Sequence, residues 1–341
     1  MAEATGTATE ARAERRAASD SARLPAGWTV IAAKELGDHL SSVRFIILLL
    51  LLGLVGVGTV YTVAQRIRDV APDATGFSGV FLLLFTETAQ AEAATAQLFP
   101  FVGLIGLLGP LLGIAFGFDA ISSERSEGTL PRLVSQPIHR DDVVNGKFAA
   151  GLSVIALVLA CATLLVAGVG ILRLGVVPRP DDVLRMVAWY VAAVVYVGFW
   201  LALATLFSVV FRRAATAALA AFSVWLGLLI FWRTIVDIVS RVIAPVGAGN
   251  RFDELLANAS LQLDILRLSP IELFGEMTNV LLDPRSRGVL LTGPPQGSIA
   301  TVLPLWQSLL ISWPQAVALL ALTVVCFAAA YIIFMRQEVR A

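Results

Sequence analysis

Six long apolar stretches constrain this chain more than any other feature of its sequence. A helix needs about 20 mostly apolar residues to cross the hydrocarbon core of a bilayer. Six stretches reach that length, near Phe45–Ala64, Leu98–Phe118, Phe148–Leu172, Val187–Val210, Ala214–Trp232 and Gln315–Met335. A seventh run, Val80–Phe85, is too short to span, and we expect it to belong to an interfacial helix. The sequence therefore predicts an all-α polytopic membrane protein with six transmembrane helices.

The composition excludes other classes of protein. The chain is 57% hydrophobic and 15% charged, whereas ordinary soluble domains carry about 25% charged residues. Its 25 basic residues balance 25 acidic ones, so no basic surface favours nucleic acid as a partner. Cys161 and Cys326 lie in apolar runs without a CxxC pair or a nearby His, and we expect buried free thiols rather than a disulfide or metal site.

The basic residues predict the orientation, because Lys and Arg accumulate in short cytoplasmic loops. With the N-terminus inside, the cytoplasmic set is Lys34, Arg44, Arg125, Arg132, Arg140, Lys147, Arg212, Arg213, Arg336 and Arg340. The smaller external set is Arg66, Arg68, Arg173, Arg179 and Arg185. Aromatic residues near the predicted outer headgroups are Tyr61, Trp189, Tyr190, Trp232, Trp306 and Trp313. Both termini are thus predicted to be cytoplasmic in a multi-pass protein of the plasma membrane.

Two segments precede the first span. Residues 1–24 have almost no large apolar side chains, and we expect a disordered cytoplasmic tail. In residues 25–44, Trp28 and other apolar residues recur at helical spacing while Lys34 and Glu35 fall elsewhere around the helix. This pattern predicts an amphipathic interfacial helix, either a simple anchor or a force-bearing element. The remainder, residues 45–341, is expected to form the six-span domain.

The second span carries glycine at four-residue spacing, at Gly109, Gly113 and Gly117. Such spacing lines small residues along one helix face, where another helix can approach closely. We favour helix packing over a translocation path as the explanation. Pro110 predicts a kink near the middle of this span.

The loop between the second and third spans, residues 119–147, is dense in charges of alternating sign and has an apolar side. Gly128 and Pro131 are expected to punctuate a short helix, Pro137 to end it, and Asp141 to cap the helix that continues into the third span. A short, two-faced element on a membrane surface suits docking into a groove of another protein.

This loop resembles the permease subunits of ABC-2 type transporters, especially exporter-like members with six spans. The resemblance lies in Glu124-Arg-Ser-Glu-Gly-Thr-Leu130, in Leu133-Val-Ser-Gln-Pro-Ile138, and in Arg140 and Lys147; Lys34 and Glu35 match more weakly. It implies that the loop is a coupling helix on a cytoplasmic ATPase, with Trp28–Arg44 as the connecting helix beside it. The implied coupling residues are Glu124, Arg125, Glu127, Gly128, Thr129, Leu130, Leu133, Pro137 and Arg140.

No G-x-x-x-x-G-K-[ST] loop occurs in the chain. We therefore expect ATP and Mg to bind a separate ATPase polypeptide and no cofactor to bind here. The resemblance implies a second permease chain, identical or not, and two ATPase chains.

Three alternatives remain. A membrane scaffold could use the same loop to recruit a protein without moving cargo. A membrane enzyme is disfavoured because His39 and His139 lack partner motifs. An ion-driven carrier is disfavoured because the spans are nearly bare of ionisable groups, and we interpret Arg233 and Asp237 as a paired interfacial anchor.

The external segment, residues 240–312, should contain two amphipathic helices separated by Ser269-Pro270, followed by an irregular loop. We expect this segment to cover the outer end of the bundle.

Overall fold

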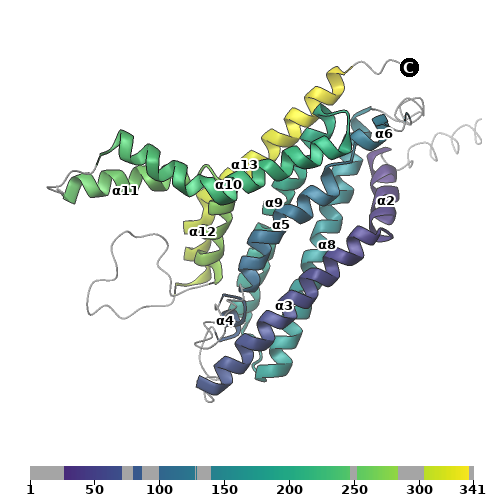
Figure 1. Cartoon of the computed structure of the whole chain (residues 1–341). Helices are drawn as coiled ribbons and strands as arrows, with labels where there is room; N and C mark the ends of the chain where they lie inside the picture. Colours follow the sequence, from purple (N-terminus) through teal and green to yellow (C-terminus); the bar gives the residue numbers. More distant parts are fainter. Residues whose placement is uncertain are drawn as a thin grey trace, which may run out of the picture.

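The computed structural model describes residues 27–70, 80–86, 100–126, 128, 140–245, 252–282 and 303–337. All regular secondary structure in these ranges is helical (Figure 1). The helices are α2 (Gly27–Leu40), α3 (Val43–Val70), α4 (Val80–Thr86), α5 (Phe101–Gly117), α6 (Ser122–Ser126), α8 (Arg140–Leu174), α9 (Pro180–Val210), α10 (Ala214–Ile243), α11 (Phe252–Leu266), α12 (Pro270–Leu282) and α13 (Leu305–Arg336).

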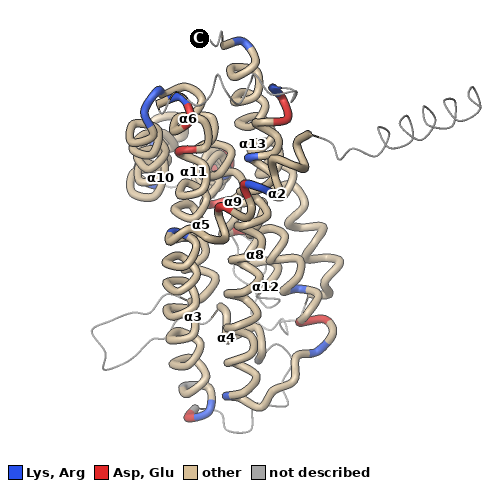
Figure 2. The backbone as a smooth tube through the Cα atoms, turned by 90° about the vertical axis from the view of Figure 1, so that its right-hand side faces the viewer, with Lys and Arg blue, Asp and Glu red and all other residues tan. Residues whose placement is uncertain are grey.

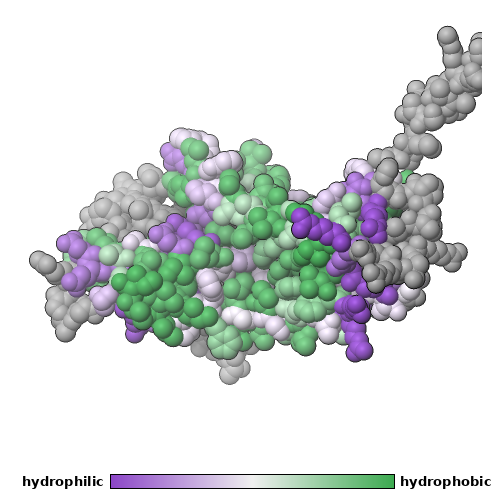
Figure 3. Space-filling model, turned by 90° about the horizontal axis from the view of Figure 1, so that it is seen from above, coloured by the Kyte–Doolittle hydropathy of each residue, from purple (hydrophilic) through white to green (hydrophobic). Residues whose placement is uncertain are grey.

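Six of these helices are long and apolar enough to cross a membrane, namely α3, α5, α8, α9, α10 and α13. Their most apolar windows have mean hydropathies between 2.1 and 2.7. In Figure 2, α3 carries charged residues only toward its two ends, and Figure 3 shows broad hydrophobic surface on the outside of the bundle. The predicted all-α, six-span membrane fold is confirmed.

Helix α9 is the core of the bundle. Its large side chains Trp189, Tyr196 and Trp200 are fully buried, and α5, α8, α10, α12 and α13 all pack against it. Trp189 packs near Phe274 and donates a hydrogen bond to Thr278 Oγ1 at 3.1 Å. The expectation that Trp189 belongs to an outer aromatic belt is therefore wrong, because α12 covers it.

The glycine face of α5 packs on α9. A Cβ atom on Gly113 would lie 2.6 Å from the backbone oxygen of Val197, and one on Gly117 would lie 2.8 Å from the backbone oxygen of Leu201. A Cβ on Gly109 would come within 2.9 Å of the Val197 side chain. These contacts leave no room for a methyl group, so the predicted packing role of the glycine spacing is confirmed.

We call the end of the bundle that holds α2 and α6 the α6 end, and the opposite end, near α4, the α4 end (Figure 1). At the α4 end, α4 buries Phe81, Leu82, Leu84 and Phe85 against the spans. The short run is thus a helix too short to span, but its side chains pack inside the bundle instead of lying along its surface.

The predicted pair of helices on either side of Ser269-Pro270 is confirmed as α11 and α12. Helix α12 does not merely cover the bundle. Its side chains Leu273, Phe274 and Met277 are buried, and the helix packs against α9 and α13. The predicted irregular loop after α12 lies outside the described residues.

Arg185 links three helices at the α4 end of the bundle through hydrogen bonds. This residue, expected in an external loop, lies in α9 with its guanidinium fully buried. It bonds to Asp181 on its own helix at 2.8 Å and donates to the backbone oxygen of Leu281 and to Ser308 Oγ, each at 3.1 Å. It also donates to the backbone oxygen of Leu303. One side chain therefore joins α9, the end of α12 and the start of α13.

Two further expectations are wrong. Arg233 and Asp237 do not pair with each other, because Arg233 bonds to Glu272 on α12 at 2.8 and 3.0 Å and Asp237 pairs with Arg241 at 2.9 Å. Cys161 is exposed on the surface of α8, although Cys326 is partly buried. Both side chains are free thiols.

Candidate coupling site

Five helices meet at the α6 end around a small apolar cluster. The cluster contains Ile31 from α2, residues beside α6 and at the start of α8, and the last turns of α9 and α13. Its buried members are Ile31, Ile121, Val143, Val144, Val209, Ala330 and Phe334. Polar contacts between the same five helices surround this cluster, and together they form the candidate site.

Lys147 is the centre of the polar contacts. Its ammonium group lies 2.8 Å from Glu124 Oε1 on α6 and 3.0 Å from Glu35 Oε1 on α2. The Lys147 side chain is only 8% exposed. Lys147 itself belongs to α8, so one nearly buried cation holds carboxylates from two other helices. Lys34 also approaches Glu35, at 3.5 Å, but its side chain is 68% exposed and contributes little.

Ser208 near the end of α9 holds the start of α6. Its hydroxyl oxygen accepts the backbone N–H groups of Ile121 and Ser122, both at 3.0 Å. The first N–H groups of a helix have no partner within the helix. A buried hydroxyl on another helix supplies that partner here, and α6 is thereby fixed to α9.

Arg125 connects α6 to the ends of α9 and α13. Its Nη1 donates to the backbone oxygen of Val209 at 3.1 Å, and its Nη2 donates to the side-chain oxygen of Gln337. Gln337 donates to the same Val209 oxygen at 3.1 Å, and Arg140 reaches the backbone oxygen of Gln337 at 3.5 Å. An arginine that binds the last carbonyls of a helix is a favourable cap.

Helix α2 lies in close contact with α8. A Cβ atom on Gly146 would come within 2.8 Å of Ile31 and of the backbone oxygen of Trp28. The Trp28 side chain itself is exposed. At the other end of α2, His39 meets the ring edge of Phe116, with ring centroids 5.2 Å apart. Burial lowers the pKa of the His39 imidazole, although nearby carboxylates oppose this effect.

The corner between α2 and α3 is tied to the end of α5. Arg44 forms an ion pair with Asp119 at 2.5 Å, and its guanidinium lies 5.0 Å from the ring centroid of Phe118. Asp119 lies two residues after the end of α5 and precedes α6. The segment that joins α5 to α6 therefore has contacts to α3 and α9 as well.

Four of the predicted coupling residues lie in the described part of the chain, and Lys147 joins one of them, Glu124, to the predicted α2 residue Glu35. Glu124 and Arg125 lie on α6, Arg140 begins α8, and Gly128 follows α6 with a φ of +70°, a left-handed conformation that favours glycine. Glu127, Thr129, Leu130, Leu133 and Pro137 lie outside the described residues.

The structure differs from expectation for Asp141 and adds two residues. Asp141 lies within the first turn of α8 and does not cap it, because the helix begins at Arg140. Sequence reasoning named neither Ser208 nor Gln337 as a site residue. Each is a polar residue near the end of an apolar span, and that position is the signal that could have found them.

The geometry suits the transmission of movement. In the part of the chain that the structure describes, no group of three His, Cys, Asp or Glu side chains could hold a metal ion. The contacts instead join the α6 segment to four longer helices through charged and buried hydrogen bonds. A displacement of α6 would therefore be transmitted to α2, α8, α9 and α13.

Comparison with known proteins identifies the family. A family model described as "ABC-2 family transporter protein" matches residues 29–339. The chain belongs to this family. A curated relative, the probable ABC transporter permease protein NosY of Pseudomonas aeruginosa, is 28% identical over 255 residues, which cover 74% of this chain and 80% of that protein. The resemblance found in the loop sequence is thus confirmed.

Family membership and fold together make this ABC-2 protein a multi-pass membrane permease subunit of a transporter. The family implies an ATPase subunit as its partner.

Proposed function

We propose that this permease is the membrane half of an ATP-driven exporter, worked by a separate cytoplasmic ATPase that docks on residues 119–147. In this arrangement both termini and the α6 end face the cytoplasm. Two permease chains and two ATPase chains form the complex. The likeness of the loop to exporter-like permeases supports the direction of transport, and the number of basic residues in the short loops supports the orientation.

The observation that carries the proposal is the double ion pair of Lys147. Removing one partner of a buried pair leaves an uncompensated charge at a cost of several kcal/mol. Glu124 and Glu35 therefore cannot move independently of Lys147 without a large penalty. An ATPase that pushes α6 would move α2 and the start of α8 with it.

The helix contacts suggest what this push achieves. Closure of the two ATPases would shift α6 and tilt α5 and α8, which begin or end beside it. Because the glycine face of α5 is smooth, α5 can slide along α9 while the two backbones stay in contact. Small sliding of packed helices is an established way to switch a protein between two states. The switch proposed here opens the dimer cavity alternately to the two sides of the membrane.

The test compares Lys147→Met with a matched control, Lys34→Met, which removes a lysine that also approaches Glu35 but is exposed. Both native cysteines are replaced by Ala, and Val183→Cys is placed on the exposed face of α9 near the α4 end. Each variant is purified with its bound ATPase and reconstituted. The accessibility of residue 183 to a membrane-impermeant maleimide is then measured without nucleotide and with ATP and vanadate.

We expect nucleotide to change the labelling rate in the parent and in Lys34→Met, but not in Lys147→Met, while the ATPase still co-purifies with all three. An unchanged response in Lys147→Met would refute the role of the ion pair. If the parent itself shows no nucleotide response, the scaffold alternative is favoured instead. Labelling of Arg140→Cys from the outside of intact cells would overturn the orientation.

A further inference from the structure

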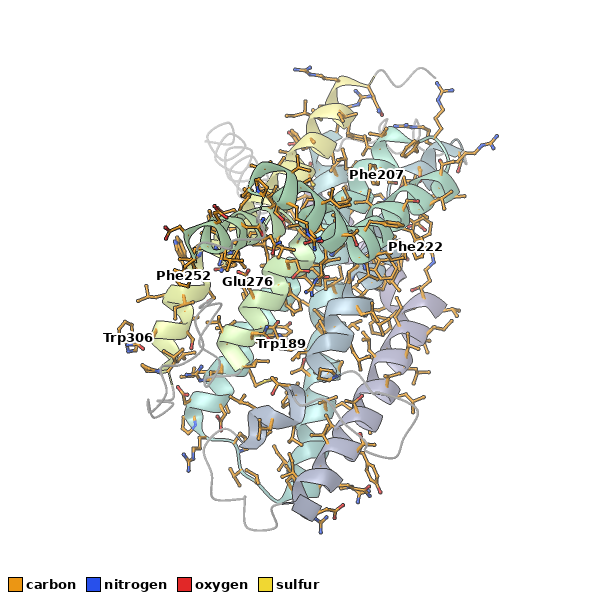
Figure 4. The ribbon with its side chains drawn as sticks, turned by 60° about the vertical axis from the view of Figure 1, so that its left-hand side comes forward. Trp189, Phe207, Phe222, Phe252, Glu276 and Trp306 are labelled. Atoms are coloured by element: carbon orange, nitrogen blue, oxygen red, sulfur yellow. The ribbon has the colours of Figure 1, made fainter. Side chains whose placement is uncertain are left out.

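A cleft of about 360 Å³ lies between α12 and α13, away from the coupling site. Arg267, Glu276 and Gln315 form its polar side. Leu273 and Val280 on α12, together with Ile311 on α13, contribute to its apolar walls. A cleft with one polar side and apolar walls suits an amphipathic molecule. Figure 4 shows Glu276 on α12, with Trp306 near the start of α13.

Two of the three polar side chains of the cleft, Glu276 and Gln315, carry hydrogen-bond acceptors. The Glu276 carboxylate accepts Arg267 Nε at 3.1 Å and Gln315 Nε2 at 2.8 Å. Arg267 pairs with this carboxylate, but its side chain is 40% exposed, whereas that of Glu276 is only 12% exposed. The carboxylate oxygens have lone pairs left for a further donor. The site therefore has an ion pair and an amide in contact, and Glu276 is the one acidic residue among the described residues that line it.

Gln315 has an acceptor that the described residues leave unused. The residue is only 7% exposed, and its Oε1 atom has no hydrogen-bond partner among the residues that the structure describes. Glu276 can only accept a hydrogen bond, so the Gln315 amide must turn its Nε2 toward Glu276 and its Oε1 elsewhere. A buried acceptor without a partner is costly. A donor supplied by a bound molecule would remove that cost.

The level of the cleft along α13 indicates where such a molecule resides. Gln315 lies 21 positions before Arg336, the last residue of α13, which is about 32 Å along a helix. The hydrocarbon core is about 30 Å thick. With Arg336 at one membrane surface, Gln315 lies near the headgroups of the opposite leaflet. Trp313 agrees with this level, because it is 65% exposed and tryptophan is enriched at membrane interfaces.

We propose that the α12–α13 cleft binds the primary ammonium group of an amphiphile, with Gln315 Oε1 and the Glu276 carboxylate as its acceptors. A primary ammonium has three N–H donors, whereas a quaternary ammonium has none. The hydrocarbon part of the molecule lies against the apolar walls. The ligand is either a phospholipid of the bilayer with an amine headgroup or a transported molecule of the same chemistry. Only the second source depends on the proposed transport function.

The first experiment measures binding on the purified full-length chain in detergent, without ATPase. Phosphatidylethanolamine and phosphatidylcholine with identical acyl chains are titrated, and bound lipid is counted by native mass spectrometry. We expect the primary amine lipid to bind about tenfold or more tightly than the quaternary one, as one hydrogen bond to a charged group implies. Gln315→Leu should reduce this preference markedly, because only the Glu276 carboxylate then remains as an acceptor. Gln307→Leu, which removes an amide from the same helix outside the cleft, should keep it.

The second experiment distinguishes the two sources. Dodecylamine and dodecyltrimethylammonium are added to the reconstituted complex, and ATP hydrolysis is measured. Stimulation by dodecylamine alone, lost in Gln315→Leu, identifies a transported amine; unchanged hydrolysis together with retained phosphatidylethanolamine identifies a bilayer lipid. Equal binding of the two phospholipids by the unaltered chain would overturn the proposal, even if Gln315→Leu fails to fold.

Discussion

Gly113→Ala tests whether the close contact of α5 and α9 limits the stability of the bundle. An added Cβ would lie 2.6 Å from the Val197 backbone oxygen and 2.9 Å from the Leu201 backbone nitrogen. Ordinary van der Waals contact begins at 3.4 Å, so α9 must retreat by about 0.8 Å. A gap of this size forfeits roughly a quarter to a half of the dispersion energy of the contacts it opens.

The magnitude follows from two opposing effects. Overpacking of a well-packed interior costs about 1–3 kcal/mol, whereas replacing glycine by alanine within a helix gains about 0.5–1 kcal/mol. Because the obstructing atoms belong to backbone, side-chain rotation cannot relieve the clash. We expect Gly113→Ala to lose about 1–2 kcal/mol in net free energy of unfolding.

Gly106→Ala is the matched control on the same helix. Among the described residues, a Cβ atom there meets only Phe274, at 4.0 Å, so the variant should keep the helix gain without a clash. Both variants are melted in detergent and followed by size-exclusion fluorescence. Gly113→Ala should melt about 2 °C or more below the parent, and Gly106→Ala at or above it. If Gly113→Ala melts as high as Gly106→Ala, the packing argument is wrong.

Three further predictions concern single side chains. Ser208→Ala leaves two buried N–H groups at the start of α6 without their acceptor. It should lower the free energy of unfolding by about 2 kcal/mol and weaken the effect of nucleotide on the labelling of Val183→Cys. An unchanged melting temperature would contradict this. Burial against Phe116 lowers the pKa of His39 below 6.5. The unfolded chain therefore binds more protons just below pH 6.5, and stability falls as the pH drops through that window. His39→Gln should reduce the pH dependence of the melting temperature between pH 5 and 7, and the same pH dependence in parent and variant would refute this. Arg185→Met removes a buried guanidinium with partners on three segments and should cost about 3 kcal/mol or more of the free energy of unfolding. The exposed control Arg241→Met should change that free energy by less than about 0.5 kcal/mol. Equal melting temperatures of the two variants would argue against the role of Arg185.

Much of the fold could be predicted because its causes are local. The length of an apolar run alone decides whether a helix can span a bilayer, so the six spans follow from the sequence. The break between α11 and α12 follows from Ser269-Pro270 for a similar reason, since proline ends a preceding helix. The glycine spacing of α5 predicted close packing because small residues at four-residue steps occupy one face.

The candidate site was predicted in part. The loop pattern located Glu124 and Arg125, and the family match confirms the resemblance on which they were chosen, while their coupling role stays a prediction. Sequence reasoning did not foresee that Lys147 would join Glu124 to Glu35, which is 112 positions away along the chain. The sequence around a single charged residue does not indicate which residue it will pair with. The pairing depends on α2 lying against α8, and only the packed helices show that.

The sequence by itself determined which segments are long and apolar enough to cross the membrane, because hydrocarbon thickness and helix rise act on each segment alone. It did not determine where the helices end, since α10 continues to Ile243 and α13 already begins at Leu305. Only the tertiary structure decided which face of each helix turns inward. In water a polar face would mark the outside, but in lipid both faces are apolar. For that reason Trp189 and Arg185, both expected at the outer surface, could be placed in the core only once α12 and α13 were seen to pack against α9.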